Sequence, residues 1–131
     1  MKITFQLARI TAGVILLQTL FYKFSGAAVS IHIFTTLGIE PYGRIGSGVI
    51  ELIAGILLLI PSQSWKGAFL GLGTMAGAIA SHLLFLGVEV LGDGGKLFAS
   101  AVVVLVCCVL VMIVQKDDIL KFANKNLGIS I

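Results

Sequence analysis

Four runs of mostly apolar residues constrain this chain more than any other feature of its sequence. A helix needs about 20 such residues to cross the roughly 30 Å hydrocarbon core of a bilayer. The expected spans cover residues 4–24, 42–61, 66–87 and 96–115, and the core of the last, residues 100–114, carries no charge. We therefore predict four transmembrane helices.

The composition excludes a water-soluble domain. Of 131 residues, 58% are hydrophobic and 11% are charged, whereas a soluble domain carries roughly 25% charged residues. The length allows a single domain, residues 1–131, so the excess apolar surface must face lipid. The nine Lys and Arg residues lie dispersed between the apolar runs, a distribution unlike that of a nucleic-acid-binding protein. The expected environment is a lipid bilayer.

The segments between the apolar runs define the expected architecture. Residues 61–64 and 92–95 have turn compositions, and short loops make neighbouring helices antiparallel. The linker 25–41 is longer, and the spacing of its apolar residues predicts a short interfacial helix that ends at Gly38. The tail, residues 116–131, has the pattern of an amphipathic surface helix with Ile119, Phe122, Ala123 and Leu127 on one face. The predicted fold is an all-α integral membrane four-helix bundle with an interfacial helix between its first two helices and an amphipathic C-terminal tail.

The basic residues near the helix ends predict the orientation. Four crossings place both termini on one side, and the side richer in Lys and Arg faces the cytoplasm. Six basic residues fall on the side of the termini, namely Lys2, Arg9, Lys66, Lys116, Lys121 and Lys125, against Lys23, Arg44 and Lys96 on the other. We expect cytoplasmic termini. A cleaved signal peptide is the alternative for the first run, with Ser25-Gly26-Ala27 as the cleavage site, but the length of its apolar stretch favours a span.

Three ionisable residues, Arg9, Glu51 and His82, lie within the expected spans. Each costs about 2.5–3.5 kcal/mol at the centre of a membrane helix unless it finds a partner, a wet cavity or the interface. At 100° per residue, each shares its side of the helix with small or polar residues. These seams are Gln6, Arg9, Gly13, Leu16, Leu20 and Lys23; Arg44, Ser47, Gly48, Glu51 and Gly55; and Gly67, Gly71, Thr74, Ala78, Ser81 and His82. We expect all three seams to face the bundle interior.

Two interpretations of the buried charges remain open. Arg9 and Glu51 differ in expected depth by one or two helical turns, so they could form an ion pair that only locks two helices. Alternatively, Glu51 and His82 belong to a ligand or proton site, although a buried His is more often a satisfied polar residue. Lys23 and Arg44 lie at the outer boundary, where long side chains reach the interface. The candidates for a ligand or proton path are Arg9, Glu51, His82, Lys23 and Arg44, and no catalytic residue is assigned.

The remaining small residues favour structural roles. Gly73 and Gly77 form a second close-packing pair, which predicts that the third span is central. The fourth span is rich in Val and Leu and has no such seam apart from Ser100, so we expect it to be the most lipid-exposed. Cys107 and Cys108 are adjacent and diverge by about 100°, so they are poorly placed to bridge and are expected to act as small hydrophobes. The sequence has no metal-ligand cluster and no flavin, haem or iron–sulfur motif.

The order of these motifs resembles the DoxX and DoxX-like family of small four-helix membrane proteins over about residues 5–115. The matching pieces are Ala8-Arg9-Ile10 with Gly13, Lys23-Phe24-Ser25-Gly26, Arg44-Ile45-Gly46 to Glu51, Ala54 to Pro61, and Met75-Ala76-Gly77-Ala78 with His82. The resemblance implies a four-helix bundle in the bacterial cytoplasmic (inner) membrane. Some relatives are described as subunits of a thiosulfate:quinone oxidoreductase, others associate with thiol and oxidative-stress proteins, and most have no established activity. The family's recurring polar positions fall on Arg9, Lys23, Arg44, Glu51 and His82.

Three functions follow as hypotheses. The first is a small membrane subunit of a quinone- or thiol-linked redox assembly, in which Glu51 and His82 are proton partners of a bound quinone held between the helices. It has no intrinsic cofactor, so electrons would come from a redox-protein partner. The second is a non-catalytic scaffold or assembly factor that binds a partner protein. The third is a small-solute or proton carrier, which would need a homo-oligomer because one four-helix unit is small for alternating access.

Overall fold

The computed structural model describes residues 2–90, 92 and 94–127. The expectations for Asp93, for residues 128–131 and for the side chain of Leu127 therefore lie outside the described part. The elements are α1 (Lys2–Phe24), α2 (Ala28–Thr36), α3 (Tyr42–Leu59), the 3₁₀ turn η1 (Pro61–Gln63), α4 (Ser64–Ser81), the π-helical turn η2 (His82–Leu86), α5 (Lys96–Val114) and α6 (Lys116–Leu127). The predicted all-α class is confirmed.

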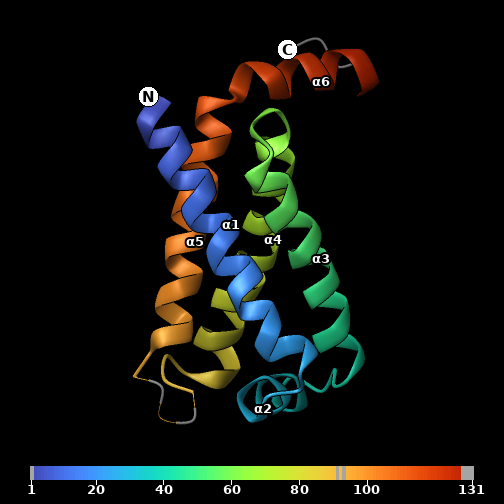
Figure 1. Ribbon diagram of the computed structural model, residues 1–131. Helices are drawn as coiled ribbons and strands as arrows, with labels where there is room; N and C mark the ends of the chain where they lie inside the picture. Colours follow the sequence, from blue (N-terminus) through green and yellow to red (C-terminus); the bar gives the residue numbers. More distant parts are fainter. Residues whose placement is uncertain (1, 91, 93, 128–131) are drawn as a thin grey trace.

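Four of the described helices form a bundle in which each helix has two neighbours. Helix α1 packs against α3 and α5, and α4 packs against the same two, so α1 and α4 lie on a diagonal (Figure 1). Within the described residues, α1, α3, α4 with η1 and η2, and α5 are each long and apolar enough to cross a membrane. The prediction of four helices able to span a membrane is confirmed in length and composition.

Small residues allow α1 and α3 to cross closely. A Cβ added at Gly13 would lie 3.3 Å from the carbonyl oxygen of Gly55, and one added at Gly55 would lie 3.5 Å from that of Gly13. Each glycine follows an alanine that is fully buried, Ala12 or Ala54. The two antiparallel helices thus meet with Gly13 opposite Gly55, and this register determines which residues face each other along the rest of the pair.

Helix α4 uses one glycine face for packing and leaves the other open. A Cβ at Gly67 would lie 2.5 Å from the carbonyl oxygen of Ala54, so only glycine fits against α3 there. At Gly73 and Gly77, a Cβ would meet no described atom within 4 Å. The third candidate span buries 17% of its most apolar window and the fourth 22%. By this measure the third span is the least buried of the four, so the prediction that the fourth is the most lipid-exposed is wrong. The prediction that the third span is central is wrong as well, because each of the four helices has two main neighbours.

The short helices lie at opposite ends of the bundle. Helix α2 lies beside the ends of α1 and α4, whereas α6 crosses the other end, near the start of α1 (Figure 1). The ring of Phe122 on α6 meets the ring of Trp65 edge-on, with centroids 5.1 Å apart, and Ala123 is buried. The linker helix ends at Thr36, slightly before the expected Gly38. That α2 and α6 lie in the membrane interfaces stays a prediction.

Candidate functional site

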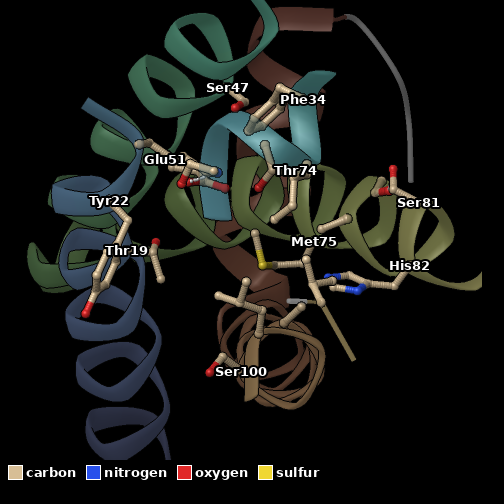
Figure 2. Close-up of a pocket in the computed structure, with 18 of the residues that line it drawn as sticks. Thr19, Tyr22, Phe34, Ser47, Glu51, Thr74, Met75, Ser81, His82 and Ser100 are labelled. Atoms are coloured by element: carbon tan, nitrogen blue, oxygen red, sulfur yellow. Dashed lines mark hydrogen bonds and ion pairs between the residues drawn. The ribbon is translucent and has the colours of Figure 1, made fainter. Parts of the chain in front are cut away.

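A cavity of about 510 Å³ lies in the half of the bundle next to α2. Side chains from α1, α2, α3, α4, η2 and α5 contribute to its wall, and apolar residues such as Leu16, Phe34 and Val104 dominate it. Figure 2 shows polar residues from separate helices around this space, with Glu51 and His82 entering from different sides and Met75 between them in the view. We call this space the bundle cavity.

An ion pair between α1 and α3 lies in the wall of the bundle cavity. Lys23 Nζ lies 2.5 Å from Glu51 Oε2, and the side chains of these residues are 17% and 3% exposed. The same ammonium lies 5.8 Å from the ring centroid of Phe34 on α2. Removing two charges from water is favourable only when they compensate each other closely. The pair therefore holds a carboxylate and an ammonium at the edge of an otherwise apolar space.

His82 lies on the opposite wall, where α4 changes to a π-helical turn. The residue is 5% exposed, and its Nδ1 lies 2.9 Å from the carbonyl oxygen of Gly87. The backbone N–H of Gly87 donates in turn to the carbonyl of His82, and Gly87 has a positive φ of 80°, which ends the turn. Single π-helical turns occur frequently at functional sites. Backbone and side chain together fix the direction of the His82 ring.

Arg9 has a different role from the predicted one. Its Nε donates to Gln6 Oε1 at 2.6 Å and its Nη1 donates to the carbonyl of Leu59 at 3.0 Å, so the guanidinium satisfies the exposed carbonyl end of α3. The predicted Arg9–Glu51 ion pair is wrong. With Gly13 opposite Gly55, Arg9 one turn earlier lies beside Leu59, and Glu51 lies beside Lys23 at the far end of α1.

Arg44 repeats this arrangement at the other end of the same helix pair. Its Nη1 donates to the carbonyl of Lys23, near the C-terminus of α1, and its Nε donates to Glu40 Oε1 at 2.8 Å. Each arginine near the start of one helix therefore caps the end of its antiparallel neighbour. Of the five sequence candidates, Lys23, Glu51 and His82 line the bundle cavity, and the two arginines belong to the packing of α1 with α3.

The Lys23–Glu51 pair was not predicted, although both residues lie on seams that were expected to face inward. Cys108 is fully buried with its Sγ against Gly71, Cys107 is partly exposed, and both thiols are free. Within the described residues, no group of three His, Cys, Asp or Glu side chains is placed to hold a metal ion.

Comparison with protein-family models, curated proteins and solved structures finds no match for this chain. The resemblance to DoxX-like proteins therefore rests on the motifs quoted above.

Proposed function

We propose that this chain is a DoxX-like membrane subunit that binds a quinone, or a lipophilic molecule of similar shape, in the bundle cavity as part of a redox assembly. The observation that carries the proposal is the cavity itself, about 510 Å³ with mostly apolar walls that include the ionisable side chains of Lys23, Glu51, His82 and Lys96. Ligand sites in proteins typically measure about 300–1,000 Å³ and combine apolar walls with a few placed polar groups. A quinone ring with part of its tail matches that description.

The polar groups suit a ring that carries two oxygens. Glu51 and His82 approach from different helices, so each can serve one end of such a ring as a proton partner (Figure 2). Lys23 supplies an ammonium donor beside Glu51. When bound, a quinone would supply the electron-accepting chemistry, taking up two electrons and two protons. Because the sequence carries no flavin, haem or iron–sulfur motif, we propose that a partner redox protein delivers the electrons.

The proposal includes a place in the bacterial cytoplasmic membrane with both termini in the cytoplasm. The start of α1 and the whole of α6 lie at one end of the bundle, and α2 lies at the other (Figure 1). Lys66 and Lys116 are at the first end, and Lys96 is at the second, in keeping with the positive-inside rule. Reporter fusions after the last residue and after Glu89 test this orientation. An exported C-terminal reporter would reverse it.

A scaffold function is the second candidate, and helix α6 is the feature that favours it. This helix crosses the end of the bundle and exposes five charged residues, Lys116, Asp117, Asp118, Lys121 and Lys125. Such a charged face is suited to a soluble partner protein. In this version the bundle only anchors α6 in the membrane.

Purification in mild detergent followed by lipid extraction and mass spectrometry tests the two candidates together. We expect quinone at near-stoichiometric amounts with the wild-type protein and a clear loss with Glu51→Gln, which keeps the shape of the side chain but removes its charge. Glu40→Gln is the matched control, because Glu40 pairs with Arg44 outside the bundle cavity. A purified protein without any lipophilic ligand but with a stoichiometric soluble partner would support the scaffold instead.

A further inference from the structure

Four of the hydroxyl groups that line the bundle cavity have already used their hydrogens. Thr19, Ser47, Thr74 and Ser81 each donate to a carbonyl oxygen of their own helix, at 2.9 Å to Leu16, 3.3 Å to Arg44, 3.1 Å to Gly71 and 2.8 Å to Gly77. A carbonyl oxygen only accepts, so the hydroxyl must be the donor in each case, and a hydroxyl has one hydrogen. Toward a ligand, these four groups therefore offer only lone pairs.

His82 is held in the same accepting state. The carbonyl oxygen of Gly87 can only accept, so the bond to Nδ1 requires the hydrogen on that nitrogen. In a neutral imidazole the second nitrogen, Nε2, is then a hydrogen-bond acceptor. The carboxylate of Glu51, 3% exposed and paired with Lys23, also only accepts.

The donors that line the cavity are Lys23, Lys96 and the hydroxyl groups of Tyr22, Ser30 and Ser100. Lys23 directs one of its three N–H groups to Glu51, and Lys96 is an exposed residue at the start of α5. At His82 and Glu51, a ligand whose oxygens only accept would leave buried acceptors facing acceptors, and unsatisfied buried polar groups are costly. A site built around a ligand hydroxyl discriminates strongly against the analogue that lacks it.

We infer that the bundle cavity prefers the reduced, hydroxyl-bearing form of its ligand, an alkylated hydroquinone, over the oxidised quinone. His82 Nε2 accepts the hydrogen of one hydroxyl and the Glu51 carboxylate accepts that of the other. This inference rests on the proposed function, and it adds which oxidation state the protein binds. We expect the hydroquinone to bind at least about tenfold more tightly, because a single hydrogen bond to a buried acceptor corresponds to about that factor.

Binding of four probes to the full-length protein in nanodiscs tests the inference. Decylubiquinone and decylubiquinol compare the two oxidation states, and decylhydroquinone and its dimethyl ether compare two molecules of similar shape with and without hydroxyl hydrogens. Dissociation constants come from titration calorimetry, with empty nanodiscs subtracted. We expect both hydroxyl-bearing probes to bind at least about tenfold more tightly than their counterparts. Equal binding, or tighter binding of the quinone, would overturn this inference alone. Absence of binding by all four probes would overturn the proposed function as well.

The variant His82→Phe tests whether His82 accepts the hydrogen of a ligand hydroxyl. Phenylalanine keeps a planar ring of similar size but has no nitrogen, so we expect the preference for the hydroxyl-bearing probes to fall about tenfold. His32→Phe is the matched control, since His32 is an exposed residue of α2, and it should keep the wild-type preference. An unchanged preference in His82→Phe would remove His82 from the inference. If that variant does not fold, the hydroquinone and dimethyl ether comparison on the wild-type protein still decides between the outcomes.

Discussion

The two halves of the bundle accommodate polar groups in different ways, one by close packing and the other around a cavity. In the half next to α6, which we call the closed half, small residues bring the backbones together and Ala54, Leu58 and Ala68 are fully buried. In the half next to α2, the same four helices leave the bundle cavity open (Figure 2). Close packing at one end therefore provides a rigid frame from which the other end can hold an open, partly polar space.

The buried cations illustrate the difference. Arg9 in the closed half donates to Gln6 and to a carbonyl at the end of α3, so its hydrogen bonds stabilise the end of that helix. Lys23 in the cavity half forms an ion pair with Glu51 beside an open space. Both residues are cations on the same seam of α1. The register of the helix pair, rather than the residue type, decides that one is structural and the other is available to a ligand.

The largest expected effect comes from breaking the Lys23–Glu51 pair. Lys23→Met leaves an uncompensated carboxylate in low dielectric, so the free energy of unfolding in detergent should fall by about 3–5 kcal/mol. The double variant Lys23→Met with Glu51→Leu should recover most of that loss, because no unpaired charge remains. Lys96→Met, at the exposed edge of the cavity, is the control and should change stability little. A double variant as unstable as the single one would show that the pair does not act as a unit.

Arg9→Met is the corresponding change in the closed half. It removes charge-assisted hydrogen bonds to carbonyls of α3 and should lower the free energy of unfolding by about 1.5–3 kcal/mol. Its effect should add to that of Glu51→Leu within about 0.5 kcal/mol, since the two residues share no partner. Thermal unfolding of the two single variants and the double variant measures this. A coupling energy larger than this would mean that Arg9 and Glu51 interact directly, contrary to the structure.

Gly67→Ala tests the close packing of the closed half directly. A Cβ there would lie 2.5 Å from the carbonyl oxygen of Ala54 and 2.7 Å from the nitrogen of Leu58, so α3 and α4 must move apart. We expect a loss of about 1–3 kcal/mol in unfolding free energy. Gly73→Ala is the matched control on the same helix, where a Cβ meets no described atom within 4 Å, and it should be neutral or slightly stabilising. Equal losses in both variants would contradict the account of this interface.

The smallest effect is expected from the cysteines. Neither thiol lines the bundle cavity, and Cys108 packs against Gly71. Replacing Cys107 and Cys108 with alanine should cost about 1 kcal/mol through lost packing and should leave ligand binding unchanged. Thermal unfolding and the hydroquinone titration measure the two outcomes. If a well-folded double variant lost ligand binding or redox activity, a thiol would belong to the site.

The directions of the buried residues could be predicted from the sequence, and their partners could not. Helical periodicity placed Arg9, Glu51 and His82 on inward-facing seams, and all three are buried. Periodicity within one helix contains no information on the register between two helices, which the Gly13–Gly55 crossing sets. The π-helical turn at His82 and the packing of α2 beside the bundle are likewise tertiary features. The bundle cavity depends on both, so no pattern in the sequence could reveal it.

Photolabelling with a light-activated quinone analogue is the most direct test of whether the ligand binds in the cavity half. The protein in nanodiscs is irradiated with the analogue in the presence or absence of excess decylubiquinol, and labelled residues are identified by mass spectrometry. We expect labelling at residues that line the bundle cavity, such as Phe34, Met75 and Leu97, and we expect excess decylubiquinol to abolish this labelling. Labelling confined to outward-facing residues such as Leu83, Leu84 and Phe85, or labelling that excess decylubiquinol does not reduce, would contradict binding in the cavity half.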